Sequence, residues 1–452
     1  MIRTCLVLVP HPDDEINIGG GFFHQLRENG IITTVVITTN GDYIPELAPI
    51  RIKEAFKAKE YLGYDNLLFL GYGDKYIGKH IYDTVENEVT MSHSGHTETY
   101  NIGGMQTYHF NKYGCQSSYN HFSYKNDIKE LILDILPDLI LCVDTDSHQE
   151  HRCLSLLFDE AMEEIIKNTN YSPFVLKKFA YLGVFCGSED YFTPEVQETK
   201  PHYQGLENVN LSYPYNWSDR VRFQNDSSNY TLRFWTSSIF KALLSHRSQK
   251  AFLQFTSICN SDVCFWIRNT KNIVLKSKLV ASSGNVKYLN DFKIVETDSI
   301  TNFSEIIEPS YIKCWRTDIG DVRPSVMVTF EKSYSVSSIL IYMLPFSNCR
   351  FIIVQLSNGY TIQKEYDGSY VFHINIPLQI DIKHVRFSFI PTDNNKPISL
   401  SEIEILENKI GSEFSNLSFK KYSGTIRRDS RLTQLASFVY RVWRFVMLKV
   451  YK

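Results

Sequence analysis

Short runs of β-branched residues alternate with helical segments through the first half of this 452-residue chain, and this alternation limits the fold more than any other feature. Residues 4–10 and 31–39 have the composition of buried parallel strands. Between them, residues 16–29 have the apolar spacing of a helix that ends at Gly30. The first forty residues therefore predict a βαβ unit.

The alternation continues along the chain. Helices are expected at residues 51–62, 128–135 and 152–166, and strands at residues 66–70 and 138–143. A further helical face at residues 237–255 closes the pattern, so we predict an α/β domain over residues 1–275 with a Rossmann-like, mainly parallel sheet and flanking helices. The stretch 75–125, rich in Tyr, His, Asn, Ser and Gly, interrupts the rhythm, and insertions of this kind are more often functional than decorative.

The sequence period changes in the second half. Apolar runs with strand character follow one another without a helix between them, at residues 327–330, 337–344, 349–356, 370–376, 383–390 and 401–406. Many short strands separated by turn residues are typical of an antiparallel β-sandwich. We therefore expect a β-sandwich domain over residues 288–408.

Residues 409–452 combine a polar linker with an amphipathic helix predicted over 431–451. Three cations, Arg441, Arg444 and Lys449, interrupt its apolar face, and a membrane span needs about 20 mainly apolar residues. A helix lying in the membrane interface fits this pattern better, and docking onto the protein itself or a partner subunit is the alternative. From residue 420 on, the chain has nine basic residues and one acidic residue, a local charge of +8. Because the net charge of the whole chain is −3, the rest of the chain carries −11.

Composition excludes several classes of protein. With 43% hydrophobic and 21% charged residues, the chain is neither wholly disordered nor a multi-span membrane protein, and a net charge near zero predicts no nucleic-acid partner. Nine scattered cysteines without a CxxC pair, and an apolar start too short for a signal peptide, predict a cytoplasmic protein with reduced thiols. Most of the 14% aromatic residues are expected to fill cores.

Two clusters of ionisable residues each follow a predicted strand. The first is His11-Pro12-Asp13-Asp14-Glu15, and the second contains Asp144, Asp146, His148, Glu150 and His151. Because the carboxyl ends of parallel strands meet at one edge of the sheet, the clusters are expected to lie together. So many carboxylates are costly to bury unless a cation neutralises them.

A catalytic zinc ion is the cation that fits best. His11, Asp14 and one histidine of the second cluster would supply two nitrogens and one oxygen and leave a fourth position open, which is the ligand set of catalytic zinc. The insertion holds a competing HxxH pair, His93 and His96, but no strand precedes it. We therefore expect those two histidines to contact substrate or solvent instead of metal.

Several motifs together resemble one enzyme family. They are Pro10–Glu15, Gly19-Gly20, Thr38–Asp42, Arg51 with Glu54 and Ala58, Leu62-Gly63, His148–Arg152 and His246–Gln249. In this order they are similar to the LmbE and PIG-L type zinc-dependent N-acetylglucosamine de-N-acetylases, and they cover most of residues 1–255.

The resemblance implies a role for each matching residue. His11, Asp14 and His151 would ligate zinc, Asp13 would be the general base, and His148 would polarise the scissile carbonyl or protonate the leaving group. The implied substrate contacts are Arg51, Asp74, Asn40 and His246. Asp146 stands where several relatives have an aromatic residue, and Glu150 replaces the usual aspartate, so we expect altered substrate contacts with zinc retained.

The chemistry follows from these roles. Zinc would polarise the carbonyl and lower the pKa of a bound water to about 7. Asp13 would take the water proton and deliver it to nitrogen. A protonated His148 facing the developing oxyanion would contribute about 3 kcal/mol. The products would be acetate and a free amino sugar.

The predicted sandwich resembles discoidin, or coagulation-factor type C, domains through Trp315, residues 337–344 and the ending at residues 385–406. That resemblance implies carbohydrate binding, and a purely structural or oligomerising domain is the alternative.

Taken together, the sequence predicts a cytoplasmic, zinc-dependent carbohydrate N-deacetylase (a hydrolase) in a glycolipid or surface-polysaccharide pathway, peripherally attached to the inner face of the membrane. The alternatives are a zinc amidohydrolase acting on a small-molecule conjugate or antibiotic, and a non-catalytic carbohydrate-binding protein, which the intact clusters disfavour.

Overall fold

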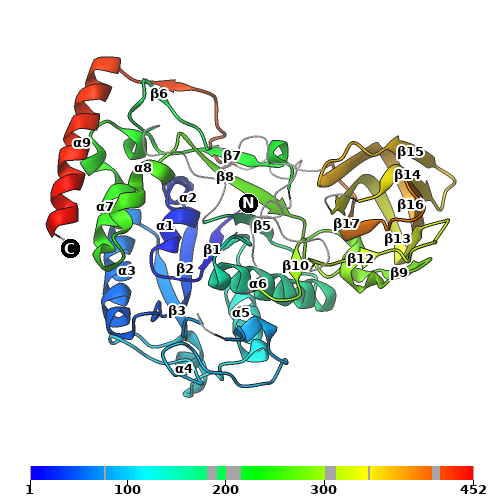
Figure 1. The fold of residues 1–452 in the computed structure, drawn as a ribbon, viewed down its shortest axis with the longest axis horizontal. Coiled ribbons are helices and arrows are strands. Elements are labelled where there is room, and N and C mark those ends of the chain that lie inside the picture. The colour runs from blue at the N-terminus through cyan, green and yellow to red at the C-terminus, as the bar shows by residue number, and fades with distance from the viewer. Residues whose placement is uncertain are drawn as a thin grey trace.

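The computed structural model describes residues 2–75, 78–180, 191–199, 215–300, 312–344, 347–409 and 418–450. Figure 1 shows an α/β body coloured blue to green, a smaller β body in yellow and orange, and a red helix α9 along the opposite side of the α/β body. One hydrophobic core lies around the first sheet and a second lies inside the β body. Among the described cysteines, none is in a disulfide.

The α/β body is built on a seven-stranded sheet with the order β3-β2-β1-β4-β5-β8-β7. Its strands are β1 (Thr4–Val9), β2 (Ile32–Thr39), β3 (Asn66–Tyr72), β4 (Leu139–Val143), β5 (Phe174–Lys178), β7 (Val221–Gln224) and β8 (Asp262–Arg268). The first five run parallel, whereas β8 is antiparallel to both of its neighbours. The predicted mainly parallel sheet is confirmed, and β5, β7 and β8 add strands that the sequence pattern did not predict.

The longer helices connect or flank these strands. They are α1 (Asp14–Gly19), α2 (Phe23–Glu28), α3 (Ala48–Leu62), α5 (His121–Ile135), α6 (Gln149–Asn168), α7 (Ser238–Ser245) and α8 (Phe255–Ile258). The single helix predicted over 16–29 is wrong, because Gly20 and Gly21 interrupt it. At Gly21 a Cβ atom would come within 2.5 Å of Val263 on β8, so the chain can approach β8 this closely only without a side chain.

The insertion at residues 75–125 folds against β3 and α6 and has little regular structure. It contains the 3-10 turn η2 (Ile81–Asp83) and the helix α4 (Tyr108–Tyr113). The Tyr119 hydroxyl donates to the carbonyl of Gly73 at 2.8 Å. His121, at the start of α5, bonds Glu160 at 2.7 Å through its Nε2. Buried polar contacts therefore hold this segment in place where apolar periodicity is missing.

The β body is an antiparallel sheet with the order β12-β17-β13-β16-β14-β15, and β9 also pairs with β13. Its strands are β9 (Lys278–Ala281), β12 (Trp315–Arg316), β13 (Ser325–Met343), β14 (Cys349–Leu356), β15 (Thr361–Glu365), β16 (Val371–Pro391) and β17 (Ser399–Leu406). Four predicted strands merge pairwise into β13 and β16, which continue through several register shifts. β9 lies before residue 288, where the sequence placed the start of this domain.

Smaller elements join distant parts of the chain. β6 (Glu195–Val196) pairs with β18 (Ile426–Arg427), and β10 (Glu296–Thr297) pairs with β11 (Ile312–Lys313). The two bodies meet at β8, where the buried Arg268 guanidinium lies 3.5 Å from the Glu404 carboxylate of β17. Next to it, the Asn272 side chain donates to the carbonyl of Ile403 and accepts from the amide of Ile405.

Helix α9 (Ser430–Val450) packs on the α/β body through one narrow face. Thr433, Ala436 and Tyr440 are buried, and the Trp443 ring lies 5.0 Å from that of Phe240 on α7. The remaining large apolar side chains are between 37% and 66% exposed: Leu432, Leu435, Phe438, Val439, Val442, Phe445, Val446, Leu448 and Val450. Among the described residues, no helix is both long enough and apolar enough to cross a membrane.

Candidate active site

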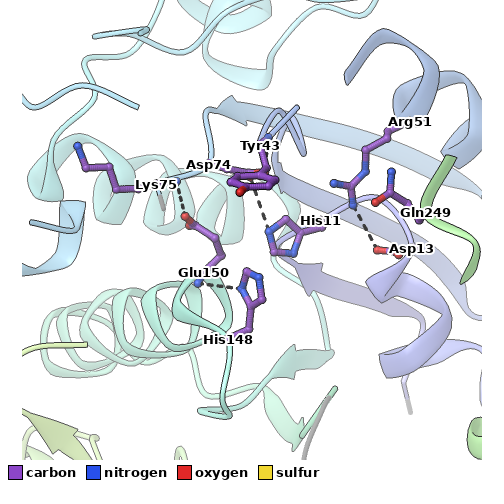
Figure 2. Close-up of a pocket in the computed structure, with 9 residues that line it drawn as sticks. All are labelled: His11, Asp13, Tyr43, Arg51, Asp74, Lys75, His148, Glu150 and Gln249. Carbon is purple, nitrogen blue, oxygen red and sulfur yellow. Dashed lines mark hydrogen bonds and ion pairs between the residues drawn. The ribbon is translucent and has the colours of Figure 1, made fainter. Parts of the chain in front are cut away.

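The two predicted clusters meet at the carboxyl edge of the sheet. β1 ends at Val9 and leads into His11–Glu15, while β4 ends at Val143 and leads into the segment before α6. These strands are parallel neighbours, so their ends lie side by side. In Figure 2 His11 and His148 lie next to each other at the centre of a pocket; their ring centroids are 4.7 Å apart and the ring planes are nearly perpendicular, at 82°.

Three donor atoms converge at this edge. Oδ2 of Asp14 lies 3.0 Å from Nδ1 of His11 and 3.2 Å from Nε2 of His151, and all three side chains are buried. Burial by itself raises the pKa of Asp14, but the charges of His151 and His11 and their hydrogen bonds hold that pKa well below its usual value. Asp14 is therefore an ionised carboxylate between two imidazoles.

Asp146 fixes the orientation of one imidazole. Its Oδ2 lies 2.8 Å from Nδ1 of His151, so Nδ1 donates to Asp146 and Nε2 is the nitrogen that faces Asp14. Two imidazole nitrogens and one carboxylate oxygen are the donor set of a divalent zinc ion with an open position. The residues present therefore fit a catalytic metal.

His148 belongs to the same cluster of nitrogen atoms. The ligand atoms of His11, His148 and His151 lie within 4.8 Å of one another. Burial, reinforced by the charges of His11 and His151, lowers the pKa of His148 to about 2. The lowered pKa favours a neutral ring, in which Nδ1 accepts from the amide of Glu150 and Nε2 carries the proton.

Asp13 stands at the start of α1 in an unusual backbone conformation, with φ at 112°. Such a conformation costs about 1–3 kcal/mol in a non-glycine residue and is typically held by its surroundings at functional sites. Its amide donates to Oε2 of Glu15 at 2.8 Å, and its carboxylate lies 3.5 Å from Nη2 of Arg51. Burial raises the pKa of Asp13 to about 6, and the charge of Arg51 opposes that rise.

Arg51 holds two loops of the site together. It reaches from α3 to donate to the carbonyls of Gly41 at 3.1 Å and Pro12 at 2.9 Å. Because Arg51 also lines the pocket, it is placed both to position Asp13 and to meet a ligand.

The other residues expected to contact substrate divide into two groups. Asp74 lines the pocket, and its Oδ1 lies 3.7 Å from Nε2 of His11. Asn40 and His246 are fully buried behind it, where the Asn40 amide donates to the carbonyls of Gly71 and Tyr100. His246 bonds Oε1 of Glu15 at 3.0 Å, so the structure places it in support of the His11–Glu15 loop.

The pocket has a volume of about 210 Å³ and is lined by His11, Asp13, Tyr43, Arg51, Asp74, Lys75, His148, Glu150 and Gln249. Tyr43, Lys75 and Gln249 were not predicted as site residues. Tyr43 follows the end of β2 at the same edge, and Gln249 ends the His246–Gln249 motif, so each carried a usable signal. The sequence carried no such signal for Lys75, because the irregular insertion brings this residue to the pocket.

Glu150 ties the insertion to the site. Its Oε1 accepts from the amide of Lys75 at 2.6 Å and lies 3.2 Å from Nε2 of the buried His80. His80, Glu150 and Cys153 form a second close group of metal-ligand types. His93 and His96 stack on Tyr43 and Tyr100 and belong to neither such group among the described residues.

Comparison with known proteins gives a family for this part of the chain. Residues 6–162 match the family model PIG-L, described as GlcNAc-PI de-N-acetylase. The N-terminal domain is a PIG-L domain. None of the curated proteins matches the chain.

Three solved structures are similar to parts of this chain. The N,N'-diacetylchitobiose deacetylase from Pyrococcus horikoshii is 19% identical, with 40% of this chain and 62% of that chain covered and a TM-score of 0.28. The lectin domain of lectinolysin, complexed with Lewis B antigen, is 18% identical, with 31% and 98% covered and a TM-score of 0.24. A Streptococcus pneumoniae fucose-binding module is 20% identical, with 30% and 98% covered and a TM-score of 0.22.

Proposed function

We propose that the PIG-L domain removes the acetyl group from an N-acetylated amino sugar of the N-acetylglucosamine type and releases acetate. One observation carries the proposal: Oδ2 of Asp14 lies within 3.2 Å of a nitrogen of both His11 and His151, at the rim of a pocket that also holds Asp13. The family match over residues 6–162 supports it independently.

A single zinc ion is the proposed cofactor, held by His11, Asp14 and His151. When bound, it supplies Lewis-acid polarisation of the amide carbonyl and activation of water. Asp13 accepts the water proton and later delivers it to the departing nitrogen, and a raised pKa suits a group that must do both. Arg51 limits that rise and keeps the carboxylate in position.

His148 acts in its neutral form. A proton on Nε2 can be donated as a hydrogen bond to the carbonyl oxygen as negative charge develops there, without a proton leaving the ring. Tyr43, Asp74, Lys75 and Gln249 supply the polar lining that orients the sugar. A volume of about 210 Å³ favours one sugar unit at a time.

Acetate release from purified full-length protein tests this activity. We expect zinc in the protein and acetate from N-acetylated glycans, with none from small-molecule conjugates. Asp13→Asn should lower the rate by about 10²–10⁴-fold and retain the metal. Asp65→Asn, which changes an exposed aspartate on the same domain, is the matched control. A protein without zinc, together with normal deacetylation by Asp13→Asn, would rule the proposal out.

The pathway and location are part of the proposal. We place the reaction in glycolipid or surface-polysaccharide metabolism, on the cytoplasmic side, with α9 lying in the membrane surface. Its exposed apolar side chains and interleaved cations support this attachment. Phe438→Asp with Phe445→Asp changes two outward residues and leaves the packed Tyr440 and Trp443 in place.

Co-sedimentation of the protein with phosphatidylcholine vesicles that contain phosphatidylglycerol measures this attachment directly. The double variant should lose binding, whereas Ile319→Asp with Leu378→Asp, on exposed residues of the β body, should bind as the wild type does. Equal binding by both double variants would contradict attachment through α9.

The β body is proposed as a carbohydrate-binding module of the same protein. Trp315, which the resemblance rests on, is fully buried and donates from Nε1 to the carbonyl of Ser283. Trp315 is therefore a core residue, and a bound glycan would have to contact the loops instead. Screening the full chain against immobilised glycans, with Asp13→Asn to prevent turnover, tests this role.

A further inference from the structure

Three helices lie in a row along one edge of the PIG-L domain: α9, α7 and α3, at the left of Figure 1. The Trp443 ring of α9 packs 5.0 Å from Phe240 on α7 and 5.6 Å from Phe252 just beyond it. Helix α7 also contacts α3. Helices α9 and α3 therefore both neighbour α7 at the same edge of the domain.

A groove of about 450 Å³ runs between α3 and α7. Its lining consists of Ile50, Lys53, Glu54, Lys57, Tyr61, Lys241, Leu244, Ser245 and Arg247. Four of these side chains are basic and one is acidic. The acidic one, Glu54, is engaged by Ser248, which donates to it from its amide at 2.9 Å and from its hydroxyl at 2.6 Å. Lys57 also pairs with Glu60 at 3.5 Å, but the four basic residues still outnumber Glu54 and Glu60, so the groove presents a net positive charge.

Apolar and aromatic surface flanks these cations. Ile50 is 46% exposed and Tyr61 is 36% exposed, and both line the groove. Cations bordered by partly exposed apolar side chains suit the interface of a bilayer, where phosphates lie directly above the acyl chains.

Helix α9 carries the same sign of charge. It contains Arg431, Arg441, Arg444 and Lys449 and no acidic residue. A second copy of the chain seated on this edge would place cations against cations, whereas an anionic bilayer complements both α9 and the groove.

We infer that the α3–α7 groove binds the headgroups of anionic bilayer lipids while α9 lies in the same membrane surface. This inference rests on the membrane attachment proposed above. Ile50 precedes Arg51 in sequence and Arg247 stands two residues before Gln249, so the groove and the catalytic pocket are built on the same two segments. Attachment at both α9 and the groove would hold the pocket close to the bilayer, where a lipid-linked amino sugar is presented.

Vesicle binding by the full chain tests the groove. The probes are vesicles of phosphatidylcholine alone and vesicles in which part of it is replaced by phosphatidylglycerol. Lys53→Gln with Lys241→Gln removes two exposed cations that touch no catalytic residue. Each basic residue near an anionic surface strengthens binding about fivefold, so the double variant should bind the phosphatidylglycerol vesicles about 25-fold more weakly. Binding to phosphatidylcholine alone should not change.

The matched control is Lys364→Gln with Lys383→Gln, two exposed lysines of the β body, which should bind both vesicles as the wild type does. Wild-type affinity of the Lys53/Lys241 variant for phosphatidylglycerol vesicles would overturn the groove assignment. If Phe438→Asp with Phe445→Asp still abolished binding in that case, attachment through α9 would stand without a contribution from the groove. Loss of affinity by the control to the same extent would also overturn the assignment, because the effect would then reflect net charge alone.

Discussion

Asp146 and His151 form a buried hydrogen bond of 2.8 Å between Oδ2 and Nδ1, and this contact decides which nitrogen of His151 is available as a ligand. Asp146 also accepts from the amide of His148 at 2.9 Å, so one carboxylate orders both histidines of the second cluster. At a position where the resemblance predicts an aromatic residue, this chain therefore has a carboxylate that would support a bound metal through His151.

Asp146→Asn should weaken zinc affinity by about 10–100-fold, because removal of the carboxylate charge makes the His151 imidazole a poorer donor. Competition with a chromophoric chelator measures the affinity. Asp127→Asn is the matched control, since Asp127 is likewise buried and pairs with His109 at 2.7 Å away from the site. Equal zinc affinity in the two variants would contradict the supporting role of Asp146.

Arg51→Lys should lower the rate of acetate release by about 100-fold with zinc content unchanged, because a misplaced catalytic group costs about that much. A lysine has all its donors on one nitrogen, so it does not reproduce the planar fork in which Nη1 donates to the carbonyl of Gly41 and Nη2 to that of Pro12. Steady-state kinetics together with metal analysis checks the prediction. Loss of zinc in Arg51→Lys would show instead that the whole His11–Glu15 loop depends on Arg51.

Glu160 should make stability depend on acid pH. Burial tends to raise its pKa, but the hydrogen bond from His121 and the charge of Lys293 lower it from 4.5 to about 2. A folded-state pKa below the unfolded value stabilises the fold above pH 4.5, and that stabilisation is lost as the pH falls toward 2. Relative to Glu160→Gln, the wild type should gain up to about 3 kcal/mol of unfolding free energy at neutral pH.

Urea unfolding at a series of pH values measures this difference. Glu163→Gln, on the same helix and paired with Lys167 at the surface, should show almost none. The pH dependence of the His121 contribution runs in the opposite direction. Because the pKa of His121 is raised, protonated His121 stabilises the fold at low pH, and this stabilisation is lost as the pH rises above 6.5. A difference between wild type and Glu160→Gln that stays constant from pH 2 to 5 would contradict the pairing.

Arg268→Met should destabilise the protein by about 3–5 kcal/mol, because it leaves the buried Glu404 without its cationic partner at the junction of the two bodies. Adding Glu404→Met should recover most of that loss, since replacing both charges with apolar side chains is often near neutral. Chemical denaturation of the single and double variants measures both effects. No recovery in the double variant would mean that Arg268 acts mainly through its bond to the carbonyl of Phe292.

The sequence predicted those parts of the fold that depend on local pattern. Alternating apolar runs predicted the parallel sheet, and strands without helices predicted the antiparallel body. The pairing of strands and its register do not follow from local pattern. Strand β9 pairs with β13, which is about 45 residues away in sequence, and four predicted strands merge into two. Those outcomes depend on which strands can cover a shared core.

For the site, the sequence by itself determined the reactive groups, because His11, Asp13 and Asp14 lie within four residues and His148 and His151 within one helical turn. Only the tertiary structure decided how they act. It buried His148 beside other imidazoles, which lowers the pKa of His148, and it placed His246 behind Glu15. It also set which apolar side of α9 packs and which stays exposed. Burial and contacts between distant segments control these properties, and a linear pattern does not contain them.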